Sequence, residues 1–391
     1  MPAFYLSCLL AFTGGHMVNY TVILYLQERV GSDLLAGIGF GLSFGTAIVF
    51  GWFAGVLCDR ISPTRVIHAA QALFLLCLAG LWWADVGAAG TTRVFWILFS
   101  AFLGGLAWSF VGPARLATLG QIAPRGKLKP AAILLNLQVL IGFGLAPVVI
   151  GVVRSHSGWP AVFATGMGFF VASSLLLSGT RTQGSDRPGQ GLRQELGEGF
   201  SAVRSNPLLA QLLLAAIIAY AMTGPMQIIL PKLAREVLGL SEMQRGAYLG
   251  LMALALITGG VSALFLGRRL HHGAAVFAGT VTASLLFASL GQWTSAAVSA
   301  TVLAGMGIIG GMVISLLVAG IQGQAPDATR GRIMSIYSII SQVVPATSGV
   351  AAGALVRSTS VGNAILIAGV SLACLALLGA ALMPQLRRAA N

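Results

Sequence analysis

Charged residues are scarce in this sequence, and so are acids and cysteines. Of the 391 residues, 8% are charged and 57% are apolar, and only ten are Asp or Glu. Soluble domains carry about 25% charged residues, so a surface that faces water on all sides is excluded. The four cysteines stand singly, without the spacing of a disulfide framework or a metal site. We therefore expect a membrane protein with no cofactor and no bound metal.

Long apolar runs fill most of the chain. A bilayer core of about 30 Å is crossed by about 20 helical residues, and lipid offers no partner to an open backbone, so each run predicts a spanning helix. The expected spans are 3–27, 34–57, 66–85, 94–114, 131–153, 159–178, 208–230, 246–266, 274–291, 296–320, 333–356 and 361–383. The sequence therefore predicts an all-α polytopic membrane protein with twelve transmembrane helices.

One long polar stretch divides these helices into two sets of six. The first part of residues 179–206 is rich in Gly, Pro and Ser, which is typical of a linker. The last part, LRQELGEGFSAVRS, has apolar residues at helical spacing along one face, which predicts a short amphipathic helix. We expect an N-terminal bundle (1–178), a cytoplasmic linker with a short amphipathic helix (179–206) and a C-terminal bundle (207–391). The string that begins at Gly104, GGLAWSFVGPARLATLGQIAPRGKL, is similar to the one at Gly310, GGMVISLLVAGIQGQAPDATRGRI. This repeat predicts two pseudo-symmetric bundles, an architecture that many secondary transporters share.

The net charge of +13 would favour a nucleic-acid partner in a soluble protein. Here the basic residues lie in short connections between apolar runs, where they set the orientation against an anionic leaflet, so we expect a lipid bilayer and no nucleic acid as the partner. With both termini cytoplasmic, 16 of the 23 Lys and Arg residues fall on the cytoplasmic side and 7 on the other. This asymmetry predicts that both ends are inside.

The string GVLCDRISPTR, residues 55–65, lies between the second and third expected spans. Its spacing resembles the cytoplasmic loop motif of the major facilitator superfamily, although Ser62 and Pro63 stand where the family usually has glycine. The resemblance implies the major facilitator fold, a monomer, and a cytoplasmic gate in which Asp59 faces the start of the eleventh helix. The gate residues that it implies are Gly55, Asp59, Arg60, Arg65, Arg115, Arg330 and Arg332.

Three further strings, VGPARLATLGQIAP, IILPKLAREVLG and QGQAPDATRGRIMSIYS, resemble the branch that includes siderophore (enterobactin) exporters and macrolide efflux proteins. The resemblance implies a secondary exporter of a small organic molecule in a bacterial inner membrane, working by alternating access and proton antiport. The fifth-helix motif of many antiporters is present only as GFGLAPVVIG, with Ala146 in place of a glycine. A multidrug or macrolide efflux pump, and an importer or facilitator of the same fold, are the alternatives.

His16, Asn19 and Tyr20 lie in the middle of the first expected span, on one helical face. Polar side chains at this depth face the bundle interior or a water-filled cavity, and histidine titrates near neutral pH. We expect this face to line a substrate cavity, with His16 as a proton-coupling candidate. The alternative is a polar group that holds two helices together.

None of the ten acids falls in the middle of an expected span, which favours neutral, zwitterionic or anionic cargo such as a siderophore. In the seventh span, Pro225 and Pro231 predict a kink, beside an adaptable apolar wall of methionines. The other cavity candidates are Asn136, Gln138, Tyr220, Met222, Met226, Gln227, Tyr337 and Gln342.

A membrane-embedded enzyme is the competing class. Such an enzyme needs a nucleophile with its catalytic partners, a His–acid pair or a group of metal ligands close to one membrane surface. The histidines outside the first span are His68, His156, His271 and His272, and none has an acid at helical spacing. We therefore expect no enzymatic activity.

Overall fold

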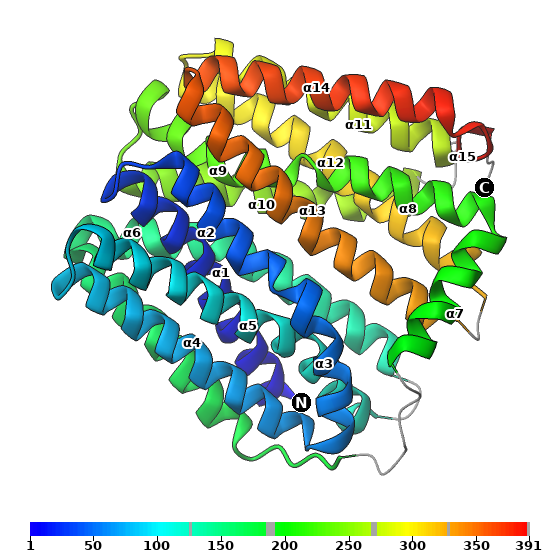
Figure 1. The fold of residues 1–391 in the computed structure, drawn as a ribbon, viewed down its shortest axis with the longest axis horizontal. Coiled ribbons are helices and arrows are strands. Elements are labelled where there is room, and N and C mark those ends of the chain that lie inside the picture. The colour runs from blue at the N-terminus through cyan, green and yellow to red at the C-terminus, as the bar shows by residue number, and fades with distance from the viewer. Residues whose placement is uncertain (125–126, 185–191, 267–271, 327–328, 389–391) are drawn as a thin grey trace. The chain divides into compact units, whose positions relative to one another are not determined.

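A computed structural model describes the chain except for residues 125–126, 185–191, 267–271, 327–328 and 389–391. The surroundings of some helical residues, Gly55 and Asp59 among them, also lie outside the described part. The described residues form helices joined by short turns, and none of them lies in a strand (Figure 1). Eleven helical segments within the described ranges are long and apolar enough to cross a membrane.

The structure divides into two compact units. The first contains Met1–Gly189 and Leu240–Gly250, and the second contains Gln190–Gly239 and Leu251–Asn391. One helix, α10 (Glu242–Leu266), therefore begins in the first unit and continues in the second. Each unit is described below by itself.

The first unit is built around its N-terminal helix. Its helices are α1 (Pro2–Glu28), α2 (Asp33–Gly45), α3 (Ala47–Arg60), α4 (Pro63–Val86), α5 (Gly90–Ile122) and α6 (Leu128–Leu177). Every residue of α1 from Ala11 to Gln27 is buried, because α2, α4, α5 and α6 all contact this helix (Figure 1, blue). The polar residues in the middle of α1 are therefore buried in the interior of this unit, and their predicted role in lining a cavity stays a prediction.

Helix α6 accounts for two of the predicted spans. It runs for 50 residues, about 75 Å at the α-helical rise, which is more than twice the thickness of a bilayer core. Gly158 interrupts it with φ of 72°, a left-handed conformation that glycine adopts without a steric penalty. The interruption lies between the predicted spans 131–153 and 159–178, so twelve crossings are accommodated.

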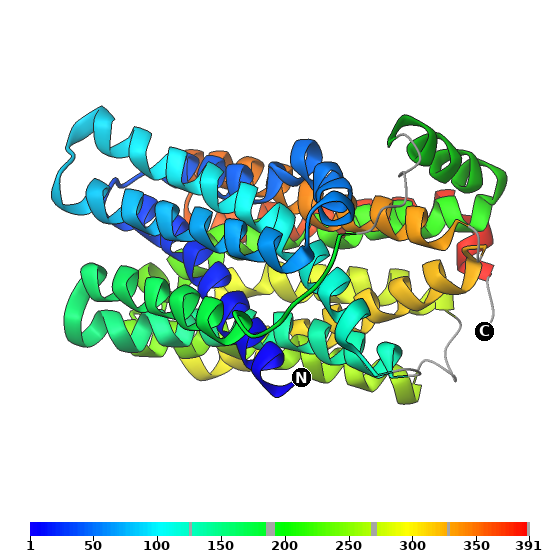
Figure 2. The ribbon, with the colours of Figure 1, turned by 90° about the horizontal axis from the view of Figure 1, so that it is seen from below.

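The second unit holds the remaining helices. They are α7 (Leu192–Ser205), α8 (Pro207–Tyr220), α9 (Thr223–Lys232), the π-helix η1 (Leu233–Val237), α11 (His272–Ser289), the short η3 (Leu290–Gln292), α12 (Ala296–Gln324), α13 (Arg330–Ser358), α14 (Val361–Leu382) and α15 (Pro384–Arg388). The short helix predicted at 192–205 is present as α7, which lies at the ends of α8 and α13 (Figure 1 and Figure 2).

The kink predicted in the seventh span is confirmed. Helix α8 ends at Tyr220, and α9 begins at Thr223 after a short turn. Pro225 has no N–H to donate to the carbonyl of Ala221, so the regular helix is interrupted at this point.

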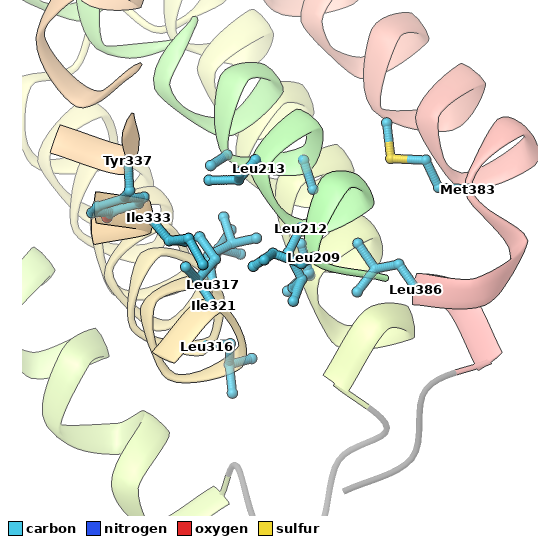
Figure 3. Close-up of a cluster of buried hydrophobic side chains, with 14 of the residues drawn as sticks. Leu209, Leu212, Leu213, Leu316, Leu317, Ile321, Ile333, Tyr337, Met383 and Leu386 are labelled. Carbon is cyan, nitrogen blue, oxygen red and sulfur yellow. The ribbon is translucent and has the colours of Figure 1, made fainter. Parts of the chain in front are cut away.

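The core of the second unit is apolar. Leucines 209, 212 and 213 of α8 pack against Leu316, Leu317 and Ile321 of α12. Figure 3 shows Ile333 and Tyr337 of α13 on one side of this cluster, and Met383 and Leu386 on the other. Because these side chains come from four segments of the chain, their burial fixes the positions of α8, α12 and α13 within the unit.

Candidate functional site

Helix α1 presents three polar side chains in a setting of aromatic rings. His16, Asn19 and Tyr20 are only 7%, 6% and 3% exposed. The His16 ring meets Trp108 of α5 edge to face at 4.8 Å between centroids, and Phe143 of α6 at 5.3 Å. Tyr20 lies against the same Phe143 at 5.8 Å. We call these five residues the His16 cluster.

Two polar atoms of the cluster have no protein partner. They are Nε2 of His16 and Nδ2 of Asn19. Leaving a buried polar atom without a partner costs about 1–3 kcal/mol, so a water, an ion or a ligand that bonds to these two atoms would be stabilised here.

A close approach of α5 to α1 brings Trp108 to His16. Gly15 precedes the histidine, and a Cβ on this glycine would collide with the Trp108 ring. On the other side, a Cβ on Gly142 of α6 would lie 2.8 Å from the backbone nitrogen of Thr13. Gly142 opens the string GFGLAPVVIG, so this string has an observed packing role here, whatever its relation to antiport.

Sequence reasoning missed both aromatic partners. Trp108 and Phe143 are ordinary apolar residues of their expected spans, and nothing in their spacing points to α1. The sequence does contain one signal of these contacts, which is a glycine directly before each of two rings: Gly15 before His16 and Gly142 before Phe143. Small residues in membrane helices let two backbones approach closely.

The other two cavity candidates of the first unit, Gln138 and Asn136, differ in their burial. Gln138 of α6 is buried, and its Nε2 donates to the backbone carbonyl of Tyr5 at 3.0 Å, while its Oε1 has no partner. Gln138 thus joins α6 to the beginning of α1. Asn136, two residues earlier, is exposed.

The candidates of the second unit centre on a pair of tyrosines. The hydroxyls of Tyr220 in α8 and Tyr337 in α13 are 2.6 Å apart, and the rings meet edge to face. Tyr337 borders the apolar cluster of Figure 3. Met222 and Gln227 are buried near the kink, whereas Met226 and Gln342 are partly exposed. The Nε2 of Gln342 donates to the Ser338 carbonyl of its own helix at 3.4 Å.

The structure describes the arginines of the predicted gate but not the surroundings of its glycine and its acid. The surroundings of Gly55 and Asp59 lie outside the described part of the chain, so the pairing of Asp59 stays a prediction. Arg60 and Arg65 are exposed. In the C-terminal unit, Arg330 donates to the carbonyl of Ala325 at 3.4 Å.

Arg115, one of the predicted gate residues and a second candidate partner of Asp59, is fully buried within the first unit. Its Nη1 donates to Cys8 Sγ at 2.9 Å, and its Nη2 donates to Ser173 Oγ at 3.1 Å. Its guanidinium also lies 5.6 Å from the centre of the Phe12 ring. The recorded partners are thus neutral groups, and no carboxylate of the described residues forms an ion pair with it.

An ion-pair ring that the sequence did not reveal joins α1, α6 and α10 in the first unit. Glu28 accepts from both Arg154 and Arg245, the latter at 2.8 Å. Glu242 pairs with the same two arginines, at 3.2 and 2.6 Å. Two carboxylates and two guanidiniums therefore alternate, and each contacts both charges of opposite sign. We call these four residues the Glu28 ring.

Glycines allow α6 and α10 to come close beside this ring. A Cβ on Gly151 would lie 2.7 Å from the carbonyl oxygen of Glu242, and a Cβ on Gly246 would collide with the carbonyl of Pro147. In addition, the Arg154 guanidinium lies 4.2 Å over the Trp159 ring. The start of α10 is thus held to the first unit by both backbone contact and charge.

Among the solved structures that this chain resembles in fold are membrane transporters. A POT family transporter, solved with a thioalcohol-conjugated peptide, superimposes with a TM-score of 0.77 over 98% of this chain and 96% of that chain, at 11% identity. A bacterial homologue of the human lysosomal transporter Spinster, in an inward-facing and unoccupied conformation, gives 0.74 over 98% and 96%, at 15% identity. At these identities the similarity shows the fold alone.

A sequence relative and a family model carry the comparison further. Macrolide efflux protein A of Streptococcus pyogenes is 23% identical over 227 residues, which are 56% of this chain and 55% of that protein. The chain thus spans about half the length of this curated relative. The model of the Major Facilitator Superfamily matches residues 4–346. This match extends over most of the chain and agrees with the helical fold, so the protein belongs to the major facilitator superfamily of membrane transporters.

Proposed function

We propose that this protein is a secondary exporter that moves a small organic molecule by alternating access, as a monomer in a bacterial inner membrane with both termini in the cytoplasm. The observation that supports a cargo site is the His16 cluster, because its two unpartnered polar atoms lie on an interior helix rather than on a lipid-facing one. Polar groups at such positions in membrane proteins usually contact a substrate, an ion or water.

The side chains of the cluster favour uncharged or anionic cargo. None of its five members is an acid. Glu28 at the end of α1 is in the ion-pair ring, and two other acids bond to residues of α1 near that end: Asp33 accepts from Gln27, and Asp85 accepts from Tyr25. A cationic drug would find no carboxylate here. We propose a siderophore or a similar neutral or anionic metabolite as the cargo.

Macrolide efflux is the second candidate function, and the relative in Streptococcus pyogenes favours it. The two candidates separate in whole cells. A strain without this gene should secrete less siderophore under iron limitation if the first is right, and should become more sensitive to macrolides if the second is right. Accumulation of the cargo inside cells that express the protein would point to an importer or facilitator instead.

The proposed driving force is proton antiport, with His16 as the group that carries the proton. Everted membrane vesicles allow the test, because cargo uptake can be followed while the pH gradient is set from outside. We expect uptake by the natural protein to depend on the gradient, and His16→Gln to weaken that dependence. An unchanged pH dependence in His16→Gln would remove the histidine from proton coupling but would leave export intact.

A further inference from the structure

The Glu28 ring lies at the opposite end of α1 from the N-terminus. Helix α1 runs from Pro2 to Glu28, about 40 Å at the α-helical rise, so the ring and the N-terminus belong to opposite membrane surfaces. Both arginines of the ring are at the same end of their helices: Arg154 precedes the interruption at Gly158, and Arg245 lies in the first turn of α10. With the termini in the cytoplasm, as proposed, the ring lies on the outer side of the membrane.

The ring holds the start of α10, which is the part of this helix that belongs to the first unit. That unit includes Leu240–Gly250, and α10 continues in the second unit from Leu251. By its place in the sequence, α10 also belongs to the predicted C-terminal bundle, whereas α1 and α6 belong to the N-terminal one. A motion of one predicted bundle against the other must therefore either separate the start of α10 from α1 and α6 or bend α10.

Glycines line the contact between α6 and α10 next to the ring. The Gly246 backbone approaches the carbonyl of Pro147. A Cβ on Gly250 would lie 2.8 Å from the side chain of Val148 and 3.0 Å from the carbonyl oxygen of Gly144. Small residues let two backbones approach closely, so such a contact has few interdigitated side chains to withdraw when the helices separate. We call this contact the glycine seam.

Water can reach the four charges of the ring. Their side chains are between 10% and 31% exposed. A single orphaned charge in a protein interior is costly, but when two helices separate into water all four charges are hydrated together, and none is left buried without a partner. Ion pairs that water can reach contribute only modestly to stability, so they close a contact without making it permanent.

From this arrangement we infer that the Glu28 ring is a latch that closes the outer side of the transporter and opens once in each transport cycle. All four ion pairs are formed in this structure, so the latch is closed. The inference rests on the proposed alternating access. It adds the residues that hold the side opposite the predicted cytoplasmic gate.

Thiol labelling in the glycine seam tests the latch without any cargo. Val148→Cys places a thiol at a half-buried position beside Gly250. The reagent is 2-sulfonatoethyl methanethiosulfonate, which is charged and therefore labels thiols that water reaches. The full-length protein is held in lipid nanodiscs, with Cys374→Ser to remove an exposed natural cysteine. We expect Glu28→Gln or Arg245→Gln to speed labelling roughly tenfold, because each removes hydrogen bonds between charged groups that keep the seam closed.

Glu236→Gln is the matched control. It removes an acid whose ion pair with Arg235 is not part of the ring, so it should leave the labelling rate unchanged. Cys77, which is buried in α4 of the first unit, reports unfolding. The inference is overturned if both ring variants leave the rate in the seam unchanged. It is also overturned if Cys77 becomes labelled as fast as the seam, since the ring would then hold the whole unit together rather than act as a latch.

Failure of the proposed export gives a different pattern. Labelling in the seam would respond to the ring variants as expected, while deletion of the gene would change neither siderophore secretion nor macrolide sensitivity. Conversely, a strain that loses export on deletion, with a protein whose labelling is the same with and without the ring, would retain the function and reject the latch.

Discussion

Glu28 at the end of α1 accepts a hydrogen bond from Arg245, which lies 217 residues later at the start of α10, with 2.8 Å between Oε1 and Nη1. The two side chains are only 10% and 12% exposed. Since Arg154 binds the other oxygen of the same carboxylate, one acid holds two separate helices.

We therefore expect Glu28→Gln to destabilise the protein by about 1–3 kcal/mol, because it leaves two largely buried guanidiniums with a single carboxylate to share. Thermal unfolding in detergent measures the change. Glu236→Gln is the control: its pair with Arg235 is more exposed, at 41% and 29%, and such pairs contribute little. Equal midpoints for both variants would show that the Glu28 ring is energetically unimportant.

Combining Glu28→Gln with Arg245→Gln gives a second test of the ring. The pair of changes removes a negative and a positive charge together, so the remaining Arg154 and Glu242 can still pair at 3.2 Å. The double variant should lose less stability than the sum of the single variants. Strict additivity would contradict a direct interaction between Glu28 and Arg245.

We expect Arg115 to be needed for transport but not for the stability of the fold. Its recorded partners are neutral, and Ser7 and Ser173 also bond each other at 2.8 Å, so they keep a partner when the guanidinium is removed. We expect Arg115→Met to leave the unfolding midpoint unchanged or to raise it, because replacing a buried charge by an apolar group is often neutral or stabilising. Cargo flux in vesicles should fall, because Arg115 is one of the predicted gate residues. A loss of several degrees in the midpoint, with normal flux in the surviving protein, would contradict this view.

Gly15→Ala should disturb the His16 cluster without touching its polar atoms. The added methyl group meets the Trp108 ring, and overpacking of this kind costs about 1–3 kcal/mol. Intrinsic fluorescence and thermal unfolding report the change. Gly112→Ala in α5 is the control, because no atom lies within 4 Å of its Cβ, and alanine there should stabilise the helix by up to about 1 kcal/mol.

The paired hydroxyls of Tyr220 and Tyr337 predict a non-additive pair of substitutions. Each single change to phenylalanine leaves the other hydroxyl without its 2.6 Å partner, at a cost of about 1 kcal/mol. The double change leaves no orphan and should cost no more than either single one. Additive losses measured by thermal unfolding would indicate that the hydroxyls act through other groups.

The order and type of the helices could be predicted from the sequence, because apolar length alone determines where a chain can cross lipid. The predicted helix at 192–205, the kink before Pro225 and the interruption near Gly158 all follow from local chemistry. The break between α2 and α3 at Thr46 was missed, since the run 34–57 contains no proline and reads as one continuous apolar segment.

The partners of the polar residues could not be predicted in the same way. The sequence predicts that His16 faces the interior, but Trp108 and Phe143 come from helices about a hundred residues away, and their spacing along the chain does not indicate the contact. The same is true of Glu28 and Arg245, which the sequence places at the ends of separate spans. Such contacts depend on tertiary packing rather than on local pattern.

Because α10 starts in one unit and continues in the other, the linker at 179–206 is a poor place to cut the gene. A fragment that stopped there would carry Glu28 and Arg154 but would lack Glu242 and Arg245, so half of its charge ring would have to be supplied in trans. Co-expressed halves would therefore be expected to depend on each other for folding, and a reporter based on a split version of this protein would signal reassembly rather than two independent parts.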